Sequence, residues 1–359
     1  MSEWRRRAEI TADVVFFRYA TDATESAAHE VYVWDLDKTY LDTAFETFRG
    51  LIKTALEKAF QKRNVPGTAT LVRALRNSWR DQHEGRSDFP IYFITGSPPQ
   101  LEQKIHQKLN LDGIYPFGLF CKDNFKNLRP SRLSRLKQQV GFKLQALLQL
   151  RLHLGGQVRQ VLWGDDSEAD AVIYSLYADI CARRLSENDL RQVLKGLNVT
   201  GQQVDTILRL QSTIPVFDPV EKIYINLAVD TDAEYYLKFG RRVVPTYNTF
   251  QAALDLYQDG RLNVDQVLLV AIDMVRNYGF TTEELQGSLD NMVRRPVLGA
   301  ETLNELIPVL QKNGLLEANY QPTLTAKAIR SKIGMRVLEL EGNLEPWVPE
   351  QIDYLHDYR

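Results

Sequence analysis

Short runs of β-branched and aromatic residues alternate, over residues 30–262, with longer segments whose apolar positions recur at helical spacing. Such runs are typical of buried strands. Strands that alternate with helices predict a parallel sheet with helices on both faces. The expected strands cover 30–35, 91–95, 160–163, 222–227 and 242–244. The pattern therefore predicts an α/β fold built on a doubly wound parallel sheet.

The helical segments are identified by apolar positions three or four residues apart. The clearest stripe begins at Ala169 and Val172 and ends at Ile180. Glycine and proline punctuation between residues 110 and 130 predicts irregular chain there. Further helices are expected over 44–62, 68–82, 187–197, 201–211 and 250–257, and from Pro99 and Gly141 onward.

Beyond Gly260 the pattern changes to helices with little strand signal, with breaks near Gly279, Pro296 and Gly314. No period of repeats is visible along the chain, so a solenoid is not expected. We expect three parts: an N-terminal extension over 1–29, a core over 30–262 with a helical insertion at about 185–215, and a helical C-terminal domain over 263–359.

Composition narrows the classes of function. The chain has 44 Lys and Arg against 46 Asp and Glu, a formal charge of −2, which argues against a dedicated nucleic-acid-binding protein. The chain has only two cysteines, Cys121 and Cys181, which argues against a fold held together by disulfides and is typical of a protein in a reducing compartment. No run approaches the ~20 apolar residues that cross a bilayer. We therefore expect a cytoplasmic protein without a transmembrane segment.

Polar side chains follow the predicted strands at their carboxyl ends, where ligands bind in such a sheet. Each group alone fits a turn or a helix cap. Because these polar groups follow successive strands of one α/β unit, they indicate a common site. The groups are Asp35-Leu36-Asp37-Lys38-Thr39, Thr95-Gly96-Ser97, Lys143 at the expected start of a helix, and Gly164-Asp165-Asp166 with Asp170 one turn further.

Converging carboxylates repel one another unless a cation lies among them. Mg²⁺ prefers such oxygen ligands together with substrate phosphate and water. Phosphoryl transfer also needs positive charge near the non-bridging oxygens, which Mg²⁺ and Lys143 would supply, and the Thr95 hydroxyl would add a hydrogen bond. The sequence therefore predicts a magnesium-dependent phosphoryl-transfer site.

The ordered motifs Asp35-Leu-Asp37-Lys-Thr39, Thr95, Lys143 and Gly164-Asp165 with Asp170 resemble those of the haloacid dehalogenase (HAD) superfamily over about residues 30–175. Further features resemble, more narrowly, the catalytic domain of the actin-patch-associated phosphatidate phosphatase family. They are Pro66-Gly67, Arg73-Ala-Leu75, Thr95-Gly-Ser-Pro98, Phe142-Lys143-Leu144 and Tyr174. Lys38, Pro99 and Asp166 depart from that family's usual residues and lie outside its catalytic set. The resemblance implies a HAD-like, Rossmann-like phosphatase core.

The resemblance also implies a role for each site residue. Asp35 would form an aspartyl-phosphate, and Asp37 would act as general acid and then general base. Thr95, Gly96 and Lys143 would bind the phosphoryl group, and Thr39 would support the loop after the nucleophile. Mg²⁺ would be held by the side chains of Asp35 and Asp165 and by the main-chain carbonyl of Asp37. Asp170 would support the metal site, and Asp166 is a rival candidate to Asp165.

Several alternatives stay open at this point. The substrate could be a phosphorylated small molecule or a phospholipid head group such as that of phosphatidate, and the oligomeric state is open. A catalytically inactive phosphate-binding or regulatory module would keep the fold without the reaction. A receiver-like signalling domain does not need Asp37. Basic residues of the C-terminal helices, such as Arg294 and Arg295, could contact nucleic acid, but neighbouring glutamates dilute them, and we expect no nucleic-acid partner.

Overall fold

The computed structural model describes residues 3–20, 28–42, 64–83, 88–123, 132–322, 348–349 and 351–356, with the backbone alone for 132–138. The chain divides into two compact units. Unit 1 comprises Met1–Arg63, Phe89–Asn226 and Val348–Arg359, and unit 2 comprises Asn64–Asp88 and Leu227–Trp347. The expected domain boundaries near 29 and 262 stay a prediction, because compactness alone does not show which parts fold independently. The expected helix over 44–62 lies outside the described residues.

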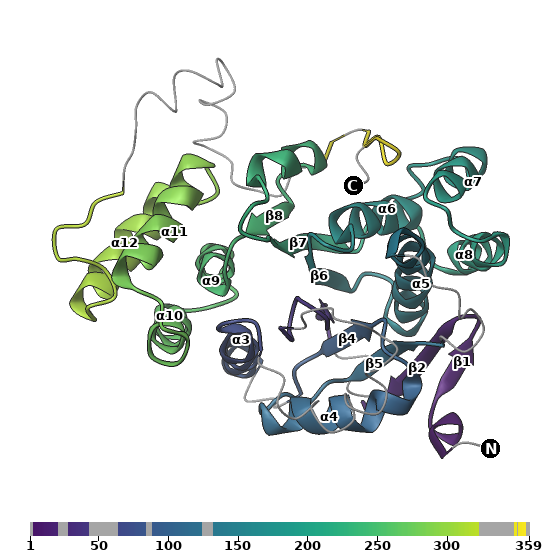
Figure 1. Ribbon diagram of the computed structural model, residues 1–359, viewed down its shortest axis with the longest axis horizontal. Coiled ribbons are helices and arrows are strands. Elements are labelled where there is room, and N and C mark those ends of the chain that lie inside the picture. The colour runs from purple at the N-terminus through teal and green to yellow at the C-terminus, as the bar shows by residue number, and fades with distance from the viewer. Residues whose placement is uncertain are drawn as a thin grey trace. The chain divides into compact units, whose positions relative to one another are not determined.

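Unit 1 is built on a mostly parallel sheet (Figure 1). Its strand order is β1-β2-β5-β4-β3-β6-β7. Strands β5, β4, β3, β6 and β7 are parallel neighbours, and the hairpin β1-β2 joins them antiparallel through β5. The strands are β1 (Glu9–Thr11), β2 (Val14–Arg18), β3 (Glu30–Asp35), β4 (Ile91–Thr95), β5 (Gly118–Lys122), β6 (Arg159–Asp165) and β7 (Val220–Asn226). The predicted α/β, Rossmann-like fold is confirmed.

Helices cover both faces of this sheet in Figure 1, with α4 on one face and α5 and α6 on the other. The chain moves from β3 to β4 and β5 on one side, then returns to β6 and β7 on the other. The reversal makes the carboxyl end of β3 the topological switch point, where such sheets bind ligands. The helices of unit 1 are η1 (Glu3–Arg6), η3 (Pro99–Leu101), α4 (Glu102–Leu111), α5 (Arg132–His153), α6 (Asp170–Ala182), α7 (Glu187–Gly196) and α8 (Gly201–Thr213).

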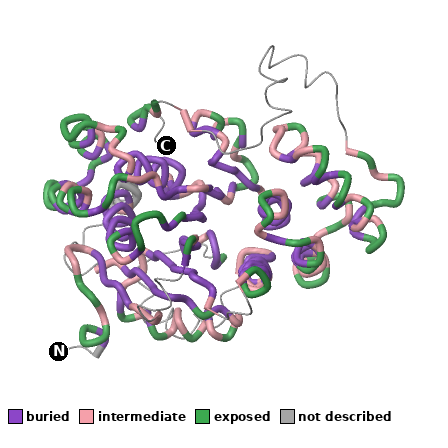
Figure 2. Tube along the Cα trace, turned by 180° about the vertical axis from the view of Figure 1, so that it is seen from behind, coloured by how far each residue is buried: buried purple, intermediate pink, exposed green. Residues whose placement is uncertain are grey.

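Aromatic side chains fix the register of the three strands that lead to the site. Trp34 of β3 stacks on Trp163 of β6 at 4.5 Å between ring centroids, and Trp163 stacks on Tyr224 of β7 at 4.8 Å. All three rings are buried, as are most residues of the strands that carry them (Figure 2). Large stacked rings on neighbouring strands stabilise the sheet and hold the following residues in a fixed place.

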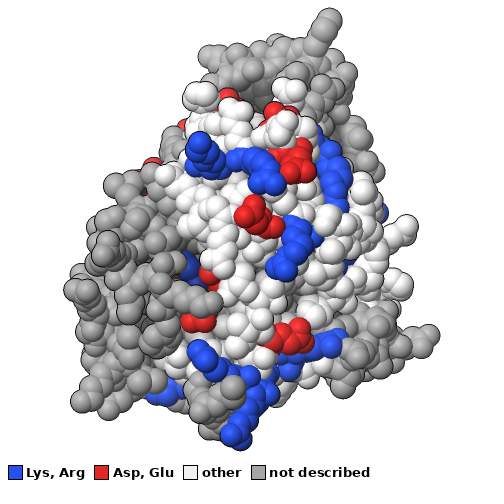
Figure 3. All heavy atoms as spheres, turned by 90° about the vertical axis from the view of Figure 1, so that its right-hand side faces the viewer, with Lys and Arg blue, Asp and Glu red and all other residues white. Residues whose placement is uncertain are grey.

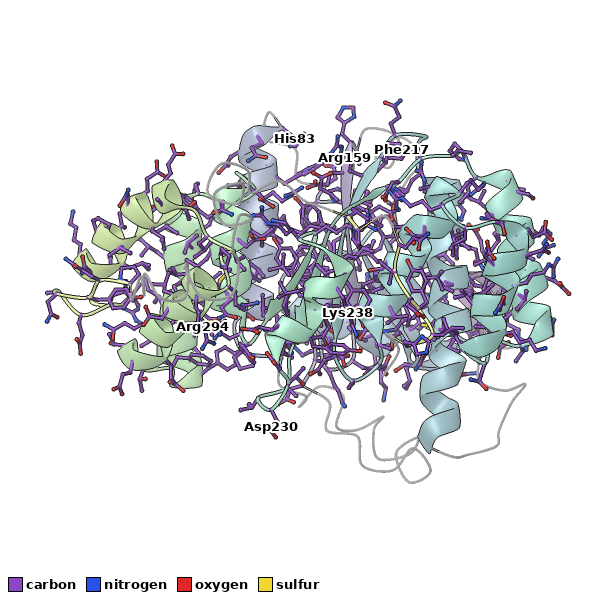
Figure 4. The ribbon with its side chains drawn as sticks, turned by 90° about the horizontal axis from the view of Figure 1, so that it is seen from above. His83, Arg159, Phe217, Asp230, Lys238 and Arg294 are labelled. Atoms are coloured by element: carbon purple, nitrogen blue, oxygen red, sulfur yellow. The ribbon has the colours of Figure 1, made fainter. Side chains whose placement is uncertain are left out.

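The parallel strands end at one edge of the sheet. Figure 4 labels Arg159 at the start of β6 and Phe217 shortly before β7, and both lie at the same, amino-terminal edge. At the opposite edge Asp35 is paired with Ile94, and Asp165 is paired with Asn226. The sheet therefore brings together the polar groups that the sequence places after separate strands.

Two sequence-based expectations about unit 1 are wrong. Residues 118–122, expected to be irregular, form β5, because a five-residue strand is hidden between Pro116 and the polar residues that follow. Lys143 does not open a helix but lies near the middle of α5, which begins at Arg132. Gly141 lies inside this helix, and a Cβ there would come within 2.5 Å of the Gln203 side chain from α8, so a residue without a side chain fits the close packing of the two helices.

Unit 2 is mainly helical, as the C-terminal pattern predicts. Its Gly67 has φ +79°, a backbone conformation that favours glycine, and a Cβ there would lie 3.0 Å from the Met274 side chain. Asn263 and Thr281 each form a capping box at a helix start, and Gly279 ends a helix in the left-handed conformation. The elements are α3 (Thr68–Gln82), η5 (Ala233–Phe239), β8 (Val243–Thr246), α9 (Thr249–Gln258), α10 (Val264–Tyr278), α11 (Thr282–Arg294) and α12 (Ala300–Lys312).

The surface has mixed charge where Figure 3 displays it, with Lys and Arg interspersed among Asp and Glu. In unit 1, for example, Arg184 bridges Asp179 and Asp218 at 2.8 and 2.6 Å. Within the described part of the chain, every helix is too short or too polar to span a bilayer.

Candidate active site

Asp35, the last residue of β3, lies at the centre of a buried polar cluster. Its side chain is only 1 % exposed. Burial raises the pKa of the Asp35 carboxyl well above its ordinary value; Lys143 opposes this shift, and the neighbouring carboxylates add to it. The hydroxyl of Thr39 donates to Oδ2 of Asp35 at 3.4 Å from the loop that follows the strand. The predicted nucleophile and its predicted supporting residue therefore lie together.

Lys143 reaches this cluster from α5 and binds three carboxylates. Its Nζ lies 3.1 Å from Asp35, 3.1 Å from Glu168 and 2.5 Å from Asp170. Burial by itself would lower the pKa of the ammonium group, but Asp170, Asp35 and Glu168 together hold it well above its ordinary value. Lys143 is therefore a charged group, fully buried, directly beside the predicted nucleophile.

Asp170 is positioned by a close approach to the end of β6. It is the first residue of α6, and its Oδ2 accepts a hydrogen bond from the backbone N–H of Asp165 at 3.1 Å. A Cβ on Gly164 would overlap the Asp170 side chain. Glycine is required at position 164 because only a residue without a side chain leaves room for this carboxylate. Burial raises the pKa of Asp170 as well.

Asp165 completes a group of carboxylates suited to a cation. Ligand oxygens of Asp35, Asp165 and Asp170 lie within 4.8 Å of one another. Oδ1 of Asp165 accepts from the Ser167 N–H at 2.6 Å, whereas Oδ2 is buried without a hydrogen-bond partner in the described part of the chain. Burial, together with Asp170 and Glu168, raises the pKa of Asp165 to about 8. A divalent ion among these oxygens would satisfy the unpartnered atom and reduce the repulsion, so the donor set fits Mg²⁺.

The geometry favours Asp165 over its rival Asp166 as a metal ligand. Asp165 is buried within the three-carboxylate group, whereas Asp166 is half-buried and is not part of that group. The backbone N–H of Asp166 donates to the carbonyl of Asn226 at 3.1 Å, which fixes the loop after β6 to the end of β7.

Asp37 is held by the second motif. The hydroxyl of Thr95, at the end of β4, donates to Oδ2 of Asp37 at 2.9 Å and accepts from the N–H of Ser97 at 3.1 Å. Gly96 lies between Thr95 and Ser97 in the sequence. The Gln139 side chain packs against it, and a Cβ on Gly96 would come within 2.6 Å of the Gln139 Nε2 atom. The structure thus brings the two aspartates of the first motif to the edge that also carries Thr95 and Gly96. The phosphate-binding roles of Thr95, Gly96 and Lys143, and a metal bond from the Asp37 carbonyl, stay predictions.

Three residues near the site were missed by the sequence analysis. Glu168 belongs to a polar loop that reads as solvated, yet it is buried and paired with Lys143. Lys122 ends β5, a strand that the sequence did not predict, and Asn226 ends β7. Asn226 donates from Nδ2 to the carbonyl of Lys38 at 3.2 Å. Asn226 lies one residue before the end of the strand expected over 222–227, which was a usable signal, because Asp35 and Thr95 also lie at strand ends.

Comparison with known proteins gives one match. The family model described as phosphatidate phosphatase APP1, catalytic domain, matches residues 31–187. No curated protein and no solved structure matches the chain. The matched segment carries every residue of the cluster around Lys143, and it is the segment in which the motifs indicated the same family. Residues 31–187 of this chain are therefore similar to the phosphatidate phosphatase APP1 catalytic domain, a match that supports a phosphatase enzyme.

Proposed function

We propose that the protein is a HAD-type, Mg²⁺-dependent phosphatase that hydrolyses a phosphomonoester through an aspartyl-phosphate on Asp35. The observation that carries this proposal is the buried contact of Asp35 with Lys143 at 3.1 Å, inside a group of three carboxylates suited to a cation. The family match over residues 31–187 supports phosphatidate as the substrate. Asp37 and Lys143 both occupy the site, which favours an enzyme over an inactive phosphate-binding module.

The first step is attack of an Asp35 carboxylate oxygen on phosphorus. A new O–P bond forms at Asp35 while the bond between phosphorus and the ester oxygen breaks. Asp37, which would have to carry a proton at this point, donates it to the departing oxygen, so the alcohol leaves neutral. The hydrogen bond from Thr95 orients Asp37 for this transfer.

The second step removes the phosphoryl group from Asp35. Asp37, now a carboxylate, takes a proton from water as the water oxygen attacks phosphorus. The bond between Asp35 and phosphorus breaks, which releases inorganic phosphate and regenerates the Asp35 carboxylate. In both steps Lys143 provides positive charge beside the phosphoryl oxygens, and removal of one such contact typically costs on the order of 3 kcal/mol in barrier.

Asp35, Asp165 and the main-chain carbonyl of Asp37 would hold Mg²⁺, with Asp170 supporting the site. The donor set fits a hard cation because it consists of carboxylate oxygens, one of them buried without a partner in the described part of the chain. When bound, Mg²⁺ neutralises part of the charge on the phosphoryl group.

The proposal is tested with Asp35→Asn, which keeps the shape of the side chain and removes the nucleophile. Phosphate release is measured with Mg²⁺ from an aryl phosphate, from glycerol phosphate and from vesicles that contain phosphatidate. Asp205→Asn, on the exposed side of α8, is the matched control. We expect Asp35→Asn to abolish turnover and the control to preserve it. Parental turnover by Asp35→Asn would refute the mechanism, and activity on the soluble esters alone would refute phosphatidate as the substrate.

A further inference from the structure

Three carboxylates of this chain surround Nζ of Lys143. Asp170 accepts a hydrogen bond from it at 2.5 Å, and Asp35 and Glu168 form ion pairs with it at 3.1 Å each. A phosphoryl group that approaches Lys143 competes with these negative charges for it. Which of the three gives way determines how strongly the site binds phosphate.

Two of the three carboxylates are fixed. Asp170 begins α6, is fully buried and also accepts the backbone N–H of Asp165. Asp35 ends the central strand β3 and accepts the Thr39 hydroxyl. As the proposed nucleophile, Asp35 must stay beside the phosphorus atom. Neither carboxylate can leave Lys143 without loss of another contact.

Among the described residues, Glu168 is held by Lys143 alone. It lies in the loop between β6 and α6, and Lys143 is its single ion-pair or hydrogen-bond partner within the described residues. Its side chain is 9 % exposed, compared with 0 % for Asp170 and 1 % for Asp35. The next residue, Ala169, has φ +60°, a backbone conformation that alanine adopts at a cost, so the loop is not in its most relaxed form. Glu168 is therefore the carboxylate most easily displaced.

A second cation lies near Glu168. Lys122 ends β5, and its backbone N–H donates to the carbonyl of Ser97 at 3.1 Å. Its Nζ lies 5.7 Å from the ring centroid of Phe142, the residue before Lys143. Burial lowers the pKa of Lys122 to about 8, while the charges of Asp13 and Glu168 oppose this shift. The charge of Lys122 therefore also attracts Glu168.

We propose that Glu168 occupies on Lys143 the position that the phosphoryl group of the substrate takes, so that Glu168 sets the affinity of the site for phosphate. This inference rests on the proposed phosphatase function and adds to it an affinity-determining residue. It predicts that removal of this buried carboxylate increases the affinity for phosphate, because a like charge no longer competes for Lys143.

The test measures the dissociation constant of inorganic phosphate by calorimetry in the presence of Mg²⁺, and kcat and KM for an aryl phosphate. Glu168→Gln and Glu168→Ala are compared with the parent protein. Asp166→Asn is the matched control, since it removes the same charge from the same loop at a half-buried position. Mg²⁺ affinity and thermal unfolding are measured for each variant.

We expect both Glu168 variants to bind phosphate at least about fivefold more tightly and to lower KM similarly, with little change in kcat. Asp166→Asn should shift phosphate affinity less than twofold. Unchanged or weaker phosphate binding by folded Glu168 variants would overturn the inference. An equal gain of phosphate affinity in Asp166→Asn would also overturn the inference, because it would indicate a general charge effect. A loss of Mg²⁺ affinity in the Glu168 variants would overturn it as well, because Glu168 would then be a metal ligand.

If the protein is not an Asp35-dependent phosphatase, the same measurements give a different pattern. In that case the parent protein shows no Asp35-dependent turnover, whereas the calorimetric gain of phosphate affinity in Glu168→Gln can still be measured. Asp35-dependent turnover together with no gain in phosphate affinity would refute only the role of Glu168.

Discussion

The Thr95 hydroxyl donates a hydrogen bond to Oδ2 of Asp37 at 2.9 Å, across 58 positions of sequence. The two residues end or follow neighbouring parallel strands, β4 and β3. The same Thr95 oxygen accepts the N–H of Ser97. Thr95 thus joins the proposed acid and base to the loop expected to bind the phosphoryl group.

Replacement of Thr95 by valine should therefore reduce kcat by about 10- to 100-fold, since Asp37 loses the donor that orients it for proton transfer. Valine also removes the acceptor of the Ser97 N–H and the hydroxyl expected to bind the phosphoryl group, so KM should rise and thermal unfolding should occur at a lower temperature. Thr95→Ser, which retains the hydroxyl, should restore most of the activity. Steady-state kinetics on an aryl phosphate checks this, and equal activity of the valine and serine variants would contradict the role of the hydroxyl.

Gly164→Ala should unfold more easily and lose activity. Its new Cβ would overlap the Asp170 side chain and push it away from Lys143. Overpacking of this kind typically costs about 1–3 kcal/mol of unfolding free energy. Gly201→Ala is the control, because a Cβ on Gly201 in α8 meets no atom within 4 Å. Denaturant unfolding measures both variants, and equal stability of the two would show that the close approach is not needed.

Asp165→Asn should lose Mg²⁺-dependent activity by at least about 100-fold, because the carboxylate with the unpartnered oxygen would no longer balance the charge of the ion. Asp166→Asn should retain most of the parental activity. Magnesium titrations after treatment with a chelator distinguish the two positions. If the Asp166 variant is the one that loses Mg²⁺ dependence, the assignment of the metal ligand is reversed.

Tyr354→Phe should lower the unfolding free energy by about 1–2 kcal/mol. The buried Tyr354 hydroxyl donates to Asp179 of α6 and attaches the C-terminal residues to unit 1. Thermal unfolding of the full chain measures the effect. Gln351→Ala, at an exposed position nearby, serves as the control. A Phe variant as stable as the parent would show that this contact contributes nothing.

The strands that carry the site were predictable because each is a short apolar run followed by polar residues. The expected strands over 30–35 and 91–95 are β3 and β4 with the same bounds, and 160–163 lies within β6. The expected carboxyl ends of β3 and β4 match the structure, whereas β6 ends two residues later than expected and β7 ends one residue earlier. The common edge follows from parallel pairing. The cluster of Asp35, Asp165 and Asp170 could therefore be predicted before any coordinates.

The rest depends on tertiary packing. Gly141 looks like a helix break, yet Gln203 of α8 occupies the space above it and α5 continues through both Gly141 and Lys143. Glu168 looks like a solvated loop residue, and only the fold turns it toward Lys143. Local sequence does not record which distant side chain fills a gap or pairs with a charge, so both features were missed.

The most direct test of the account is detection of phosphate bound to Asp35. The protein is mixed with excess substrate and Mg²⁺, quenched within milliseconds, and treated with borohydride, which reduces an acyl phosphate to an alcohol. Peptide mass spectrometry then locates the reduced side chain. An aspartyl-phosphate on Asp35 gives homoserine at position 35 in the parent protein and none in Asp35→Asn. Efficient turnover without any modification at Asp35, or with the modification at another carboxylate, would contradict it.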